Sequence, residues 1–111
     1  QNTIVSYTDG SFQIFDISAS LTITLSNFPN DKIAGHLRIY LTNNTTNSVN
    51  VTFNVNAGTI KTYTGFTYNG TNNVNATPNP VTIVSNSNAT IDFWTYNNGT
   101  IVFMKHVGTF A

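Results

Sequence analysis

TIDFWTYNNGTIVFMKH, residues 90–106, is the stretch of this 111-residue chain that best predicts its fold. A type I′ turn needs positive φ at both central residues, and Asn98-Gly99 supplies such a pair between two apolar runs. A two-residue turn also fixes the register of the hairpin around it. The expected cross-strand pairs are Tyr96 with Ile101, Trp94 with Phe103, Asp92 with Lys105, Phe93 with Met104, and Ile91 with His106. We expect the opposite charges of the third pair to attract each other across the strands.

Both faces of this hairpin carry apolar or aromatic side chains. One face suits the core of a sandwich and consists of Ile91, Phe93, Val102 and Met104. The other face consists of Trp94, Tyr96, Ile101 and Phe103. An exposed apolar patch of that size usually marks a partner surface, although strands buried on both sides within one domain have the same pattern. We therefore predict that copies of the chain associate through this second face.

The composition points to one domain, residues 1–111, with a neutral surface that carries few charges. Only 7% of the residues are charged, the formal net charge is zero, and there is no Cys. Such a surface has no basic patch to bind phosphates, so we expect no nucleic-acid partner. No apolar run approaches the roughly 20 residues of a membrane span. The bias towards Asn, Thr and Ser favours an extracellular location or the surface of a virion.

The rest of the chain consists of short alternating segments separated by turn-forming residues. About eight short strands with a turn signal every eight to twelve residues are typical of an antiparallel β-sandwich or jelly roll. Asp9-Gly10 is a second hairpin-type turn, and residues 69–80 form a long irregular loop. We predict strands at residues 3–7, 11–17, 20–25, 36–42, 49–56, 59–63, 81–84 and in both halves of 90–106.

Residues able to perform catalysis or bind a metal are scarce. His36 and His106 lie on predicted strands with no acid at a suggestive spacing, so we interpret both as surface or interface residues. Two histidines without Cys cannot complete a zinc site in one chain, although a trimer axis could gather one from each copy. Paired carboxylates for glycoside hydrolysis could come only from Asp9, Asp16, Asp31 and Asp92. Two of these lie in turns and Asp92 has Lys105 opposite it, so we predict no enzyme, no cofactor and no metal.

Three aromatic residues flank the irregular stretch. Tyr63, Phe66 and Tyr68 could stack on sugars, or they could cover the end of the core. Asn69 and Asn75, in the long loop, are the best candidates for glycosylation among the Asn-X-Thr sequences, if the host makes N-glycans.

Five segments carry a resemblance to a known family: LTITL (21–25), GHLRIYLTN (35–43), VNVTF (49–53), TPNPVTI (77–83) and IDFWTYNNGTIVFMKHVGTFA (91–111). From residue 21 onward the chain resembles the C-terminal β-sandwich domains of bacteriophage fibre and capsid-surface proteins. A similar ending closes the polypeptide in that family. The resemblance implies a non-enzymatic domain, commonly trimeric, that decorates the virion or approaches the host surface. Family members often have a Trp-containing segment where this chain has KTYTGFTYNG (61–70), so no ligand contact is carried over.

We therefore expect an all-β structural or attachment module on an extracellular particle, first of all a virion fibre or capsid-decoration domain. Its partners would be other copies of itself, in a trimer or polymer, and a host-surface glycan or other virion proteins. One alternative is a subunit of an extracellular cell-surface filament assembled by strand donation, with residues 1–17 as the donated segment. A second alternative is a carbohydrate-binding module that uses Tyr63, Phe66 and Tyr68.

Overall fold

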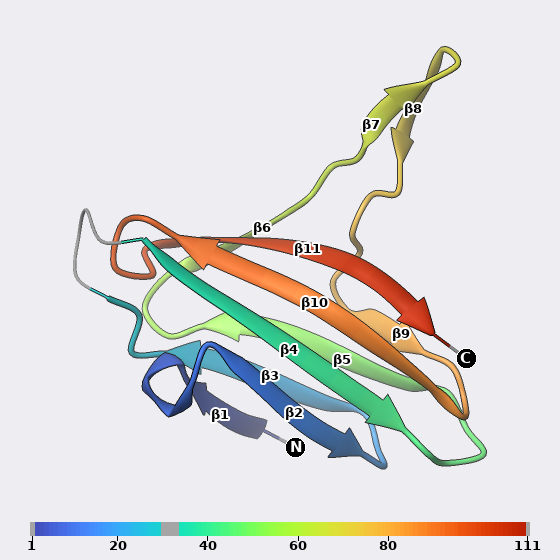
Figure 1. The fold of residues 1–111 in the computed structure, drawn as a ribbon, viewed down its shortest axis with the longest axis horizontal. Coiled ribbons are helices and arrows are strands. Elements are labelled where there is room, and N and C mark those ends of the chain that lie inside the picture. Colours follow the sequence, from blue (N-terminus) through green and yellow to red (C-terminus); the bar gives the residue numbers. More distant parts are fainter. Residues whose placement is uncertain (1, 30–33, 111) are drawn as a thin grey trace.

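The computed structural model describes residues 2–29 and 34–110, which form a β-sandwich of two packed sheets (Figure 1). The four-stranded sheet has the order β1 (Asn2–Ser6), β3 (Leu21–Ser26), β5 (Val49–Val55) and β9 (Val81–Ile83). The five-stranded sheet has the order β2 (Phe12–Ile17), β4 (Gly35–Asn43), β10 (Ser87–Thr95), β11 (Ile101–Phe110) and β6 (Thr59–Thr62). A separate hairpin, β7 (Phe66–Tyr68) and β8 (Thr71–Val74), projects from the body as an arm. The all-β sandwich predicted from the sequence is confirmed, with eleven strands in the described residues instead of about eight.

The sheets are mixed, so the prediction of an antiparallel sandwich is wrong in this respect. From β1 to β6, consecutive strands alternate between the two sheets. Strands that neighbour each other within a sheet are therefore two apart in the chain and run in the same direction, as in the pairs β1/β3, β3/β5 and β2/β4. The pair β6/β11 is also parallel. The antiparallel pairs of the two sheets are β4/β10, β10/β11 and β5/β9.

The chain does not turn back as a hairpin at Asp9-Gly10, which corrects the second turn prediction. A short 3-10 helix, η1 (Tyr7–Asp9), carries the chain from the four-stranded sheet to the five-stranded sheet. The hydroxyl of Ser6 accepts a hydrogen bond from the backbone N–H of Thr8 and so caps this helix. Tyr7 packs on Phe28, with the two ring centroids 5.6 Å apart.

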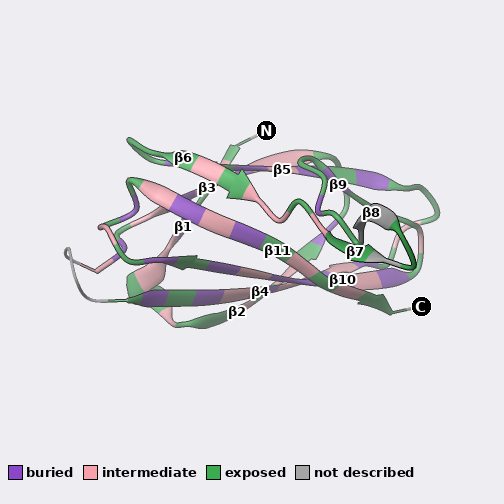
Figure 2. Ribbon diagram, turned by 90° about the horizontal axis from the view of Figure 1, so that it is seen from above, coloured by how far each residue is buried: buried purple, intermediate pink, exposed green. Residues whose placement is uncertain are grey.

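The core lies between the facing sides of the two sheets, where buried and exposed residues alternate along the strands (Figure 2). The expected alternation is confirmed in β4 and β5, whose inward side chains are buried. Phe53 and Phe93 meet across the sheets with their ring centroids 4.9 Å apart. The largest fully buried side chains are Phe53, Phe93, Ile23, Leu25, Leu37, Ile39, Leu41, Ile83, Ile91, Met104, Val5 and Val51.

The terminal hairpin has the predicted register, from Trp94 opposite Phe103 to Ile91 opposite His106. Asn98 and Gly99 have φ values of 60° and 78°, as a type I′ turn requires. The regular ladder ends at Trp94 and Phe103, so the expected Tyr96–Ile101 pair is not part of it.

Residues 69–80 are not one irregular loop, which corrects a further prediction. Asn69 and Gly70 have φ values of 50° and 79° and connect β7 to β8 in a tight turn. The arm is anchored at its base, because the backbone N–H of Tyr63 donates to the Met104 carbonyl and that of Thr77 donates to the Tyr63 carbonyl, each at 2.8 Å.

The segment considered for strand donation pairs within its own chain in this structure. β1 pairs with β3 and β2 pairs with β4, and both are edge strands. Exchange of residues 1–17 between copies concerns an assembly and stays a prediction. The part of the chain that the structure describes contains no helix long and apolar enough to cross a membrane.

Candidate functional site

The predicted self-association residues lie on the solvent side of the five-stranded sheet, and three of them form an aromatic cluster: Trp94, Tyr96 and Phe103. The Phe103 ring stacks between the other two, with centroid distances of 5.9 Å to Trp94 and 6.1 Å to Tyr96. Trp94 is 39% exposed and Tyr96 58% exposed, whereas Phe103 and the neighbouring Ile101 are half-buried. The chain therefore covers part of this apolar surface itself and leaves one face of the cluster to solvent.

A group of charged side chains lies beside the aromatic cluster. Arg38 donates two hydrogen bonds to the Asp92 carboxylate, 2.7 Å from Nε and 2.9 Å from Nη2, and His36 Nε2 lies 3.6 Å from the same carboxylate. These bonds from the guanidinium hold the pKa of Asp92 below its ordinary value, against the opposing effect of partial burial. The expected ion pair between Asp92 and Lys105 is absent from the described part of the chain, although the register that places them opposite is correct. Arg38 lies on the neighbouring strand β4, and its planar guanidinium donates two hydrogen bonds to the carboxylate at once, which the ammonium group of a lysine cannot match in geometry.

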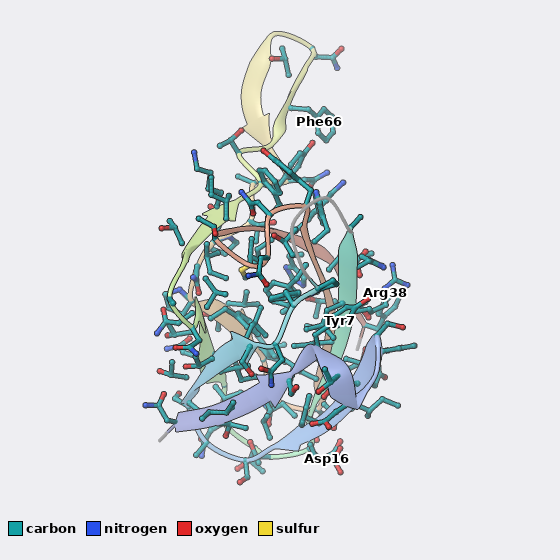
Figure 3. All side chains as sticks on the ribbon, turned by 90° about the vertical axis from the view of Figure 1, so that its left-hand side faces the viewer. Tyr7, Asp16, Arg38 and Phe66 are labelled. Carbon is teal, nitrogen blue, oxygen red and sulfur yellow. The ribbon has the colours of Figure 1, made fainter. Side chains whose placement is uncertain are left out.

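Lys105 points instead to the base of the arm. Its Nζ lies 4.6 Å from the centroid of the Tyr63 ring, a cation–π contact. Beside this contact is a hollow of about 390 Å³, which we call the arm-base hollow. It is lined by Tyr63, Phe66, Asn75, Ala76, Lys105, His106, Val107 and Gly108. Figure 3 shows Phe66 on the arm, away from Arg38 on the body of the sandwich.

The structure thus brings together two of the three aromatic residues predicted as a ligand site, Tyr63 and Phe66. Both residues line an open hollow, and neither belongs to the buried core. The side chain of Tyr68 lies outside the described part of the chain. Comparison with known proteins gives no significant match to a family model, a curated protein or a solved structure.

Three polar residues that line the arm-base hollow were not expected at a ligand site from the sequence: Asn75, Lys105 and His106. Lys105 and His106 lie in the second strand of the terminal hairpin, far in sequence from Tyr63. Only the parallel pairing of β6 with β11 brings them to the arm. No local sequence pattern predicts that pairing, because parallel strands are connected through long crossovers.

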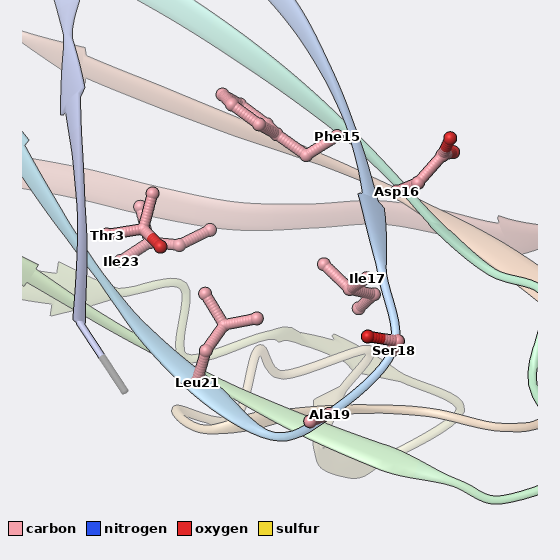
Figure 4. Close-up of a pocket in the computed structure, with 8 residues that line it drawn as sticks. All are labelled: Thr3, Phe15, Asp16, Ile17, Ser18, Ala19, Leu21 and Ile23. Carbon is pink, nitrogen blue, oxygen red and sulfur yellow. The ribbon is translucent and has the colours of Figure 1, made fainter.

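The remaining candidates are scattered over the fold. Asp16 borders a smaller hollow of about 140 Å³ at the open edge of the sandwich, but its carboxylate points away from the apolar lining residues (Figure 4). That carboxylate accepts a hydrogen bond from the Thr42 hydroxyl. Asp9 lies in η1, and Asp31 lies outside the described residues. In the described ranges, no three His, Cys, Asp or Glu side chains gather to hold a metal ion. Asn69 and Asn75 are both exposed.

Proposed function

We propose that this chain is a non-enzymatic structural or attachment module on an extracellular particle, such as a virion fibre or capsid-decoration domain, and that copies associate through the aromatic cluster. The observation that carries the proposal is the position of this cluster on the solvent side of β10 and β11. Aromatic residues of this kind are enriched in the buried centres of interfaces between proteins.

The charge distribution supports association of identical copies. The formal net charge is zero, so two copies meet with little overall repulsion. The carboxylate nearest the cluster, that of Asp92, is already paired with Arg38 within the chain. Its burial in an interface would therefore not leave an isolated charge, which is the costly case.

Sedimentation of the wild-type chain and of two variants tests this proposal. Trp94→Ala removes an exposed ring and should shift the chain to smaller species, while the fold stays intact. Val51→Ala is the matched control, because it removes fully buried core atoms and should lower stability with much less effect on association. A wild-type chain that sediments as a monomer at high micromolar concentration would refute the proposal.

A further inference from the structure

The arm-base hollow has the size and position of a small-molecule site. Its volume of about 390 Å³ falls within the range of ligand pockets in proteins. Its walls come from the arm and its base on one side and from β11 on the other. It shares no residue with the aromatic cluster, although Tyr63 also borders a neighbouring hollow lined by Trp94 and Phe103.

The backbone of Tyr63, one of the two aromatic walls of this hollow, is fixed by hydrogen bonds. Tyr63 is fixed through its own backbone, which donates to Met104 and accepts from Thr77. Thr77 is buried and its hydroxyl accepts a hydrogen bond of 2.8 Å from the backbone N–H of His106, so both sides of the hollow are tied together. Phe66 keeps 44% of its surface exposed. A wall whose backbone is fixed in this way loses little conformational entropy when a ligand binds.

The charge of the hollow is positive. Lys105 contributes one full positive charge, and an ammonium group has three N–H donors, so its contact with the Tyr63 ring leaves it able to bind an anion. None of the described residues that line the hollow is Asp or Glu. The carboxylate opposite Lys105 in the sheet, Asp92, is bound to Arg38. His106 and Asn75 add polar groups, and Nε2 of His106 lies 2.9 Å from the Thr109 hydroxyl.

These features select one ligand chemistry. The apolar C–H face of a sugar ring packs on the negatively polarised face of an aromatic ring, and its hydroxyls bond to amide and imidazole groups. A neutral sugar would leave Lys105 without an anionic partner, whereas a nucleoside triphosphate would bring several negative charges to a single lysine. We propose that the arm-base hollow binds a sugar that carries one carboxylate per ring, with the sugar ring against Phe66 and the part of Tyr63 that Lys105 leaves uncovered, and the carboxylate at Lys105.

Calorimetric titration of the full chain with defined saccharides tests this inference. The charged probes are oligogalacturonate and sialyllactose, and the neutral probes are the methyl-esterified oligogalacturonate and lactose. We expect saturable binding of at least one charged probe, about tenfold weaker binding of its neutral counterpart, and weaker binding in added salt. The charged probe that binds identifies whether the carboxylate comes from a uronic acid or a sialic acid.

Five variants locate the binding. Tyr63→Ala should weaken it about tenfold and Lys105→Ala about fivefold. Phe12→Ala and Lys61→Ala, which remove an exposed ring and a lysine outside the hollow, should leave it unchanged. Tyr63→Phe keeps the ring and should retain most of the affinity, and thermal melting of each variant separates lost binding from lost folding.

Three results would overturn the inference: no saturable binding of either charged probe, equal binding of charged and neutral probes, or equal losses in Lys61→Ala and Lys105→Ala. None of these results bears on sedimentation, so failure here and failure of the proposed assembly remain distinguishable.

Discussion

Replacement of Asn43 by Ala should destabilise the sandwich more than any surface substitution nearby. Asn43 ends β4 and is fully buried. Its amide nitrogen lies 2.8 Å from the Asn47 carbonyl, 3.0 Å from that of Ile83 and 3.2 Å from that of Val84. Its amide oxygen accepts from the backbone N–H and the hydroxyl of Thr45. One side chain therefore joins the end of the five-stranded sheet to the end of β9 in the other sheet.

The expected loss of stability depends on which carbonyl groups lose a hydrogen-bond donor when Asn43 is replaced. The Val84 carbonyl still accepts from the Ser87 hydroxyl, and the Thr45 hydroxyl, released from Asn43, can donate to the Asn47 carbonyl 3.0 Å away. The buried Ile83 carbonyl loses the donor that Asn43 supplies. Each lost net hydrogen bond costs about 1 kcal/mol, and Asn43 bonds several partly or fully buried partners, so we expect a loss of about 3 kcal/mol.

Urea unfolding measures this loss. With a urea dependence of roughly 1–3 kcal/mol per molar, the midpoint should fall by about 1–3 M. Asn44→Ala is the matched control, because Asn44 is exposed and its replacement should change stability by less than about 0.5 kcal/mol. Asn43→Asp keeps an acceptor for Thr45 but presents a carboxylate to three carbonyl oxygens, and should be at least as destabilising at neutral pH. A loss below about 1 kcal/mol for Asn43→Ala, or a stable Asn43→Asp, would refute the reasoning.

Three further substitutions test other contacts. Because Arg38 lowers the folded-state pKa of Asp92 below its ordinary value of 3.8, this carboxylate stabilises the fold above about pH 4 and loses that effect as the pH falls through its folded-state pKa. Asp92→Asn should therefore be less stable than the wild type at pH 7, with a difference that disappears in acid; a constant difference in melts across pH would contradict this. Gly58→Ala would place its Cβ against the backbone carbonyl of Gly99, so we expect a loss of about 1–3 kcal/mol in urea unfolding, and an unchanged midpoint would show that this approach can relax. Asn79 exchanges two hydrogen bonds of 2.9 Å with the backbone of Phe53, so Asn79→Ala should cost about 1 kcal/mol; faster amide exchange at Phe53 would confirm the contact, and unchanged exchange would count against it.

Local signals predicted what depends on neighbouring residues. The Asn98-Gly99 pair set the register of the terminal hairpin, and apolar alternation identified the buried faces of β4 and β5. The same Asn-Gly signal at residues 69 and 70 also marks the turn of the arm, but the dense run of Asn and Thr around it was read as an irregular loop. That turn was therefore predictable from the sequence.

Long-range choices were not predictable in this way. Alternation and turn residues show where strands begin and end, but not whether a turn joins two strands of one sheet or carries the chain to the opposite sheet. Asp92 illustrates the consequence, since its cross-strand neighbours include both Lys105 and Arg38 and only the placement of β4 beside β10 decides the partner. The aromatic residues of the candidate ligand site could be predicted because they are close together in sequence. Lys105 and His106 could not, because they come from a strand distant in sequence.

Because the arm is anchored only at its base, the fold of the sandwich depends little on the sequence of the arm. Tyr63 and Thr77 close the segment between them with a single backbone hydrogen bond, and no described residue between them belongs to the buried core. A peptide of different length or composition inserted between these two positions would be presented on the same platform without repacking the sheets. The molecule is therefore suited to vary its outermost contact surface, by evolution or by grafting, at almost no risk to its architecture.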